Sequence, residues 1–229
     1  MLYIITLIAF ISIYIALIFL MKYFTNVKLT NAIFTASVFI PYIMLVVTIY
    51  RNTGFYDWNF QNTLPVANVS PFMFTIVPLS LILPKKIKKH FLLLISLLSV
   101  GMFLSGALGC VYNAVIKYKF HIHFTYDFFA HFALSLYGVY IVKSKQVDLS
   151  RSNALISSLI IFAVATLMLI LNVIFDTAFF GLSLNGKHNI YLIVLVDSSY
   201  LSALIYYLGL CLVLVFGYIY SKLLSKKSG

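Results

Sequence analysis

The run NALISSLIIFAVATLMLILNVIFDTA, residues 153–178, decides the fold class of this chain. It contains no Lys, Arg or Glu, and its only charged residue is Asp176, close to its end. A transmembrane helix needs about 20 consecutive apolar residues to cross roughly 30 Å of hydrocarbon, and this run exceeds that length. Because a backbone exposed to lipid must satisfy its own hydrogen bonds, the run predicts a membrane-spanning α-helix.

Six further apolar runs fill most of the chain. They are residues 2–21, 31–50, 69–84, 91–116, 124–142 and 199–221. The third run is the shortest and is bounded by prolines, and the first is interpreted as a retained helix rather than a signal peptide. Hydrophobic residues make up 63% of the 229 positions and charged residues 9%, which excludes a soluble domain. The sequence therefore predicts an all-α protein, a polytopic transmembrane bundle of about seven helices that forms a single domain over residues 1–229.

The net charge of +11 follows the expected membrane topology. Twelve of the sixteen basic residues fall in alternate loops and the tail, which would lie on one side of the membrane. They are Lys22, Lys28, Lys85, Lys86, Lys88, Lys89, Lys143, Lys145, Arg151, Lys222, Lys226 and Lys227. By the positive-inside rule that side is cytoplasmic, so the N-terminus is expected outside and the C-terminus in the cytoplasm. These charges would face anionic lipid headgroups, and nucleic-acid binding is set aside.

Neither a metal centre nor a cofactor is expected. Cys110 and Cys211 lie at different depths, which argues against a disulfide. His121 and His123 alternate like an exposed extended segment and lack a third ligand at a suitable spacing. The expected partners are membrane lipids. The sequence leaves the oligomeric state open because it contains no clean Gly-x-x-x-Gly face.

Polar residues inside the apolar runs converge on one layer, in the half of the bilayer that would face outward. They are Thr75, Cys110, Asn113, Asp127, His131, Asn172, Asp176 and Asp197. At 1.5 Å per residue, Thr75 and His131 would lie at nearly the same depth below the outer surface. A charge or an imidazole in hydrocarbon costs several kcal/mol unless it is paired or hydrated, so such residues indicate a functional site.

Three of these residues have the chemistry of an activated nucleophile. Asp127 and His131 are four residues apart, so a carboxylate would lie beside the imidazole on one helical face. The Thr75 hydroxyl would be the nucleophile and His131 its base, if their helices are neighbours. Two simpler interpretations stay open: Thr75 could bond the carbonyl of its own turn, and Asp127 could cap its helix.

Four stretches resemble a known family. The segment from Asn68 to Pro84 and the segment from Asp127 to Tyr140 are similar to the bacterial YwaF-type integral membrane proteins, as are the stretches His188-Asn189-Ile-Tyr-Leu and Leu204-Ile-Tyr-Tyr-Leu-Gly. The resemblance covers residues 30–220, approximately. The eukaryotic relatives of that family include a transmembrane phospholipid acyltransferase, in which a Cys forms an acyl-enzyme and a His assists.

The resemblance implies roles for particular residues. The family His corresponds to His131, but Thr75 stands at the position of the nucleophilic Cys, and Met73 at the position of a His. A more distant likeness to the ADTRP-type fatty-acid-ester hydrolases implies that a Thr can fill the nucleophile's role. Asn189 corresponds to an Asn of the family's tail motif and would line the same cavity.

The expected function is that of a lipid-active acyl enzyme, an acyltransferase or an ester hydrolase. Thr75, His131 and Asp127 would be catalytic, and a second set would bind substrate: Asn113, Asn172, Asp176, Asn189 and Asp197. The resemblance to bacterial proteins implies the cytoplasmic membrane as the location. Two alternatives remain, a non-catalytic accessory or immunity-type membrane protein and a small transporter subunit.

Overall fold

The computed structural model describes residues 2–54, 63–65, 68–112, 122–175 and 199–226. Within these ranges the chain forms seven α-helices, one short 3-10 helix and no strand, which confirms the predicted all-α bundle. In chain order the elements are α1 (Leu2–Leu20), η1 (Met21–Tyr23), α2 (Val27–Thr53), α4 (Val69–Ile82), α5 (Lys85–Tyr112), α6 (Ile122–Lys143), α7 (Arg151–Phe175) and α8 (Ser199–Lys226).

Local sequence signals explain where two of these helices begin. The side chain of Asn26 accepts a hydrogen bond from the backbone N–H of Leu29 at the start of α2. In the same way the side chain of Asn68 accepts from the N–H of Val69 at the start of α4. Asparagine is a preferred N-cap because it satisfies a backbone donor that the first helical turn leaves without a partner.

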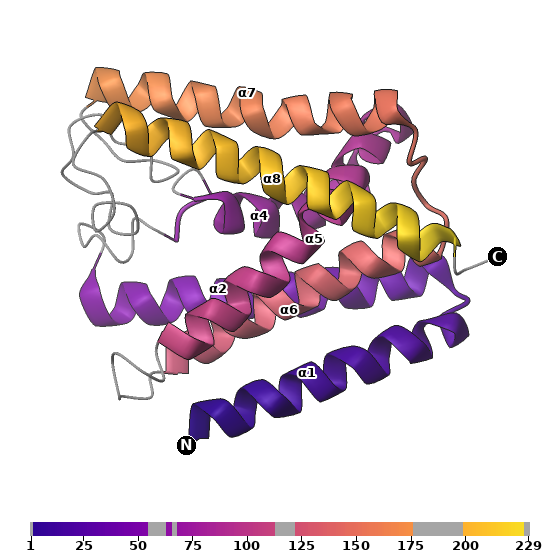
Figure 1. Ribbon diagram of the computed structural model, residues 1–229. Helices are drawn as coiled ribbons and strands as arrows, with labels where there is room; N and C mark the ends of the chain where they lie inside the picture. Colours follow the sequence, from indigo (N-terminus) through magenta and orange to yellow (C-terminus); the bar gives the residue numbers. More distant parts are fainter. Residues whose placement is uncertain (1, 55–62, 66–67, 113–121, 176–198, 227–229) are drawn as a thin grey trace.

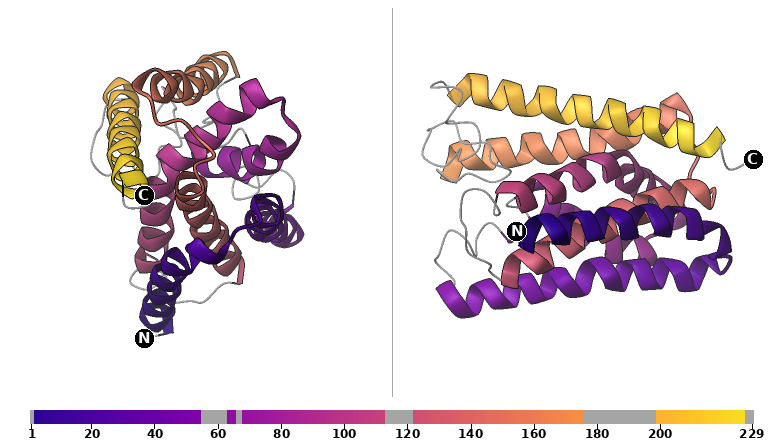
Figure 2. Two further views of the ribbon diagram at one scale, coloured as in Figure 1. Left: turned by 90° about the vertical axis from the view of Figure 1, so that its right-hand side faces the viewer. Right: turned by 60° about the horizontal axis from the view of Figure 1, so that its bottom comes forward.

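The α5–α6 pair forms the centre of the bundle (Figure 1). Helix α2 packs on α6, whereas α7 and α8 both pack on α5. The short α4 lies against α2 and α5. Helix α1 contacts α5 and α6 at the periphery (Figure 2). The turn between α1 and α2, the link between α6 and α7, and the end of α8 all lie at one end of the bundle. Because these segments carry many of the lysines, we call it the basic end.

Four of the described helices are long and apolar enough to cross a membrane. They are α2, α5 over Lys85–Gly109, α7, and α8 over Ala203–Lys226. Large aliphatic side chains on these helices are exposed, among them Ile40, Leu108, Ile174 and Phe216, each by more than half. An apolar surface of this kind indicates contact with lipid, so the chain is a membrane protein. That α1, α4 and α6 also span the bilayer, and that the N-terminus faces outward, stay predictions.

Candidate functional site

His131 lies inside the bundle at the point where α4, α5 and α6 meet. Its residue is only 4% exposed, and the ring of Phe74 from α4 packs edge-on against the imidazole, with the centroids 5.0 Å apart. Gly106 on α5 allows this close approach, since a Cβ there would lie 3.1 Å from the Cβ of His131. The imidazole is therefore held in one orientation by its neighbours.

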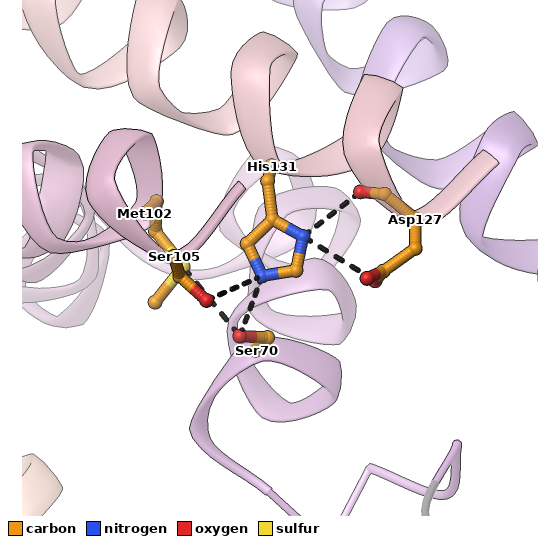
Figure 3. Close-up of polar contacts among 5 residues, drawn as sticks. All are labelled: Ser70, Met102, Ser105, Asp127 and His131. Atoms are coloured by element: carbon orange, nitrogen blue, oxygen red, sulfur yellow. Dashed lines mark hydrogen bonds and ion pairs between the residues drawn. The ribbon is translucent and has the colours of Figure 1, made fainter. Parts of the chain in front are cut away.

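The Nε2 atom of His131 faces two serine hydroxyls (Figure 3). Ser70 Oγ, from the first turn of α4, lies 2.8 Å from Nε2. Ser105 Oγ, from α5, lies 3.4 Å from the same nitrogen. The shorter distance is that of a well-formed hydrogen bond and the longer one is at the limit, so Ser70 is the principal partner.

The Nδ1 atom of His131 faces only acceptors, and both belong to Asp127, four residues earlier on α6. The backbone carbonyl oxygen of Asp127 lies 2.8 Å from Nδ1, and the carboxylate oxygen Oδ1 lies 3.3 Å away. A carbonyl can only accept, so Nδ1 carries the proton in the neutral imidazole. Nε2 is then the acceptor, and the Ser70 hydroxyl donates to it. The tautomer matches the one that a general base for Ser70 requires.

The position of Ser70 favours a reactive hydroxyl. It is the second residue of α4, where the aligned peptide dipoles stabilise negative charge. In this turn Val69 donates to the Asn68 side chain, Pro71 has no N–H, and the N–H of Phe72 donates to the Asn68 carbonyl. Of these first-turn positions, the backbone N–H of Ser70 is the donor that lies beside the Ser70 hydroxyl and is not bonded to Asn68. Met102 Sδ, 3.8 Å from Ser70 Oγ, is a second and weaker acceptor for that hydroxyl.

On the α4 side Phe74 is fully buried and Ser70 is half-buried, and the site is also accessible along α5 and the start of α6. Ser105 is exposed, and the neighbouring Leu104 and Leu108 on α5 are 51% and 66% exposed. The Asp127 side chain is 44% exposed, whereas that of His131 is 5% exposed. A molecule approaching from the lipid-facing side of α5 would meet Ser105 before His131 and Ser70.

The predicted contact between Asp127 and His131 is confirmed, but the predicted pairing of Thr75 with His131 is wrong. Thr75 Oγ1 donates to the carbonyl of Pro71 in its own helix, at 3.0 Å, which is the simpler of the two interpretations left open. Thr75 follows Ser70 by five residues, so it points about 140° away around α4 and lies about 7.5 Å further along the axis. The depth comparison failed because it assumed that every helix starts at the same membrane level, whereas the first turn of α4 already lies beside His131.

The predicted substrate-binding residues do not join this cluster where the structure describes them. Asn172 is buried at 3% exposure on α7, which packs on α5 and α8 rather than on α6. Asn113, Asp176, Asn189 and Asp197 lie outside the described residues. The side chain of Cys110 is likewise outside them.

Sequence reasoning missed both serines. Ser70 lies two residues after Asn68 and directly before Pro71, inside the apolar run 69–84, where a serine is typical of the start of a helix. Ser105 follows Met102 by three residues and precedes Leu108 by three, inside an apolar run. A serine in such a run usually bonds a carbonyl of its own helix. The one usable signal was the α4 macrodipole, which makes a first-turn hydroxyl a better nucleophile than one further along.

In comparisons with known proteins, no family model, no curated protein and no solved structure matches this chain.

Proposed function

We propose that the protein is a membrane-embedded serine esterase or acyltransferase that acts on the acyl ester of a lipid. The observation that carries the proposal is the 2.8 Å contact between Ser70 Oγ and His131 Nε2, with Nδ1 of the same ring held by Asp127. Nucleophile, base and orienting group in this order are the arrangement that activates a serine for acyl transfer. The resemblance of the sequence to lipid acyl enzymes implies the same class of reaction. It implies a nucleophile at position 75, however, whereas the proposed nucleophile is Ser70.

In the proposed reaction Ser70 Oγ attacks the carbonyl carbon of the ester while His131 Nε2 takes the hydroxyl proton. The carbonyl oxygen becomes an oxyanion, which the N–H of Ser70 and the Ser105 hydroxyl would stabilise. The bond from the carbonyl carbon to the alcohol oxygen then breaks, and Nε2 returns its proton to that oxygen. The acyl group is left on Ser70 and passes to water in hydrolysis or to an acceptor alcohol in transfer.

The lipid as substrate class follows from the surroundings of the site. The accessible edge is formed by exposed aliphatic side chains of α5, and α5 is one of the four helices able to cross a membrane. A substrate with a long acyl chain could remain in the bilayer while its ester group reached Ser105 and Ser70.

The test is covalent labelling of the purified protein with a lipid-like fluorophosphonate probe. Wild type is expected to be labelled, and Ser70→Ala and His131→Gln to lose labelling by at least about 100-fold, which is the lower range of a general base's contribution. Thr75→Ala is the matched control, because it removes a hydroxyl from the same helix, and it is expected to be labelled like wild type. Equal labelling of Ser70→Ala and wild type would remove the proposal.

A non-catalytic bundle is the alternative that one observation favours. His131 is almost completely buried, and a serine–histidine bond between α4 and α6 could serve only to join two helices, as polar side chains do in membranes. In that case wild type would not react with the probe, and Ser70→Ala would lower thermal stability without changing any reactivity.

A further inference from the structure

A second feature of the bundle is an apolar cavity of about 300 Å³ between α1, α2 and α6. Its walls include Tyr14 and Leu17 from α1, Ile33 and Phe34 from α2, and Phe132 and Leu136 from α6. Helix α1 packs on α5 and α6, whereas α2 packs on α4 and α6, so the two outer helices stand apart (Figure 2). Residues of both helices line the cavity. The volume is at the lower end of the roughly 300–1,000 Å³ that ligand sites occupy.

This cavity is separate from the Ser70–His131 site. It lies on the face of α6 that carries Phe129 and Ala133, whereas His131 contacts α4 and α5. Neither Ser70 nor Ser105 belongs to its walls. Whatever occupies the cavity therefore need not be the substrate of the proposed reaction.

The walls require an apolar occupant. Of the twelve wall residues nine are aliphatic or aromatic without a polar atom, and three carry a hydroxyl: Tyr14, Thr30 and Ser37. The Tyr14 hydroxyl is already bonded to Ser135 Oγ at 2.8 Å. Apolar cavities do not hold water, and an empty one forfeits the dispersion contacts of its walls. Ile13 and Ile33 at the rim are 54% and 55% exposed, so the cavity opens between α1 and α2 toward the surrounding lipid, where hydrocarbon chains are at hand.

The end of the cavity near the α1–α2 turn is positively charged. Phe24 and Thr30 line it there, and two exposed lysines flank them in the sequence, Lys22 in η1 and Lys28 in the first turn of α2. The Lys22 ammonium lies 4.9 Å from the centre of the Tyr23 ring. The N-terminus of α2 adds the positive end of its helix dipole. No Asp or Glu occurs among residues 1–56, so no carboxylate from this part of the chain neutralises the two lysines. An anion is the group that fits this position.

We propose that the cavity binds one acyl chain of an anionic phospholipid whose phosphate lies against Lys22, Lys28 and the start of α2. The apolar walls hold the chain, and the basic turn selects the headgroup. The lipid fills the gap between α1 and α2, so it belongs to the bundle as a bound ligand of the leaflet at the basic end. This proposal stands independently of the esterase chemistry.

The test is native mass spectrometry of the full chain in neutral detergent, titrated with phosphatidylglycerol or phosphatidylcholine of equal chain length. Wild type is expected to retain one phosphatidylglycerol with a clear preference over phosphatidylcholine. Lys22→Gln combined with Lys28→Gln is expected to weaken phosphatidylglycerol binding about fivefold for each ammonium group removed, with phosphatidylcholine binding unchanged. Ala133→Phe, which fills the cavity, is expected to weaken the binding of both lipids at least tenfold.

The matched control is Lys85→Gln combined with Lys86→Gln, because these two exposed lysines begin α5 and do not line the cavity. It is expected to bind both lipids like wild type. The proposal is overturned if this control loses as much affinity as the Lys22 and Lys28 variant, if wild type does not discriminate between the lipids, or if the folded Ala133→Phe protein binds both lipids unchanged. The lysine variants keep the test valid if Ala133→Phe fails to fold, since all four lysines are at the surface.

Discussion

Helices α6 and α7 bury their side chains in opposite ways. On α6 every residue from Leu134 to Val142 is buried, so this stretch is enclosed on all sides. On α7 the buried residues form one stripe at intervals of three and four: Ala154, Ser157, Ile161, Ala165, Met168 and Asn172. Yet α7 is among the four described helices that are long and apolar enough to cross a membrane, whereas the described part of α6 is not among them.

The difference shows what apolar composition measures in a membrane protein. A helix that faces lipid must be apolar on its outer surface, whereas an enclosed helix can carry polar groups if its neighbours satisfy them. The Asp127–His131 pair therefore belongs to a helix that its neighbours enclose, where partners for the two polar groups are available.

The largest expected effect is on packing. Leu134→Ala on α6 removes a side chain that is 0% exposed, and it should destabilise the protein by about 2–5 kcal/mol. Leu167→Ala on α7, where the side chain is 51% exposed, should change stability by about 0.5 kcal/mol or less, because lipid replaces the lost contacts. Thermal unfolding in detergent measures both. Equal losses would mean that α6 and α7 are enclosed to the same degree.

A smaller difference is expected for two helical glycines. A Cβ at Gly138 on α6 would lie 2.6 Å from Ser99 Cβ and 2.9 Å from the carbonyl oxygen of Ile95, whereas a Cβ at Gly209 on α8 would meet no heavy atom within 4 Å. Gly138→Ala should cost about 1–3 kcal/mol through overpacking. Gly209→Ala should stabilise by up to about 1 kcal/mol through helix propensity. The same unfolding assay reports both values, and a stabilising Gly138→Ala would contradict the close α5–α6 crossing.

The sequence was sufficient for the fold class but only partly for the site. The length and composition of the apolar runs fixed the helices, since a membrane span is recognisable without its neighbours. The Asp127–His131 pair was also predictable, because a spacing of four residues decides a contact within one helix. Which hydroxyl of α4 faces His131, that of Ser70 or that of Thr75, was not predictable, because it depends on how far α4 is shifted along α6. That shift is set by packing between helices distant in sequence, and Gly106 and Phe74 are part of it.

The smallest expected effect is that of removing the carboxylate of Asp127, whose side chain is 44% exposed. Asp127→Asn keeps the backbone carbonyl that holds Nδ1 at 2.8 Å, so the tautomer of His131 should be preserved and only the carboxylate is lost. Fluorophosphonate labelling should slow about tenfold, below the roughly 10²–10⁴-fold that a complete general base contributes. Thermal stability should change little. Asp148→Asn in the α6–α7 link is the control and should label at the wild-type rate; a drop in stability with unchanged labelling would contradict the orienting role of Asp127.

The most direct measurement is to identify the modified residue in fluorophosphonate-treated wild-type protein by peptide mass spectrometry. The arrangement of Ser70, His131 and Asp127 predicts that the phosphonyl group is found on Ser70 and that Thr75 of the same treated protein remains unmodified. Modification of Thr75, or of neither residue under conditions that label a known serine esterase, would contradict it.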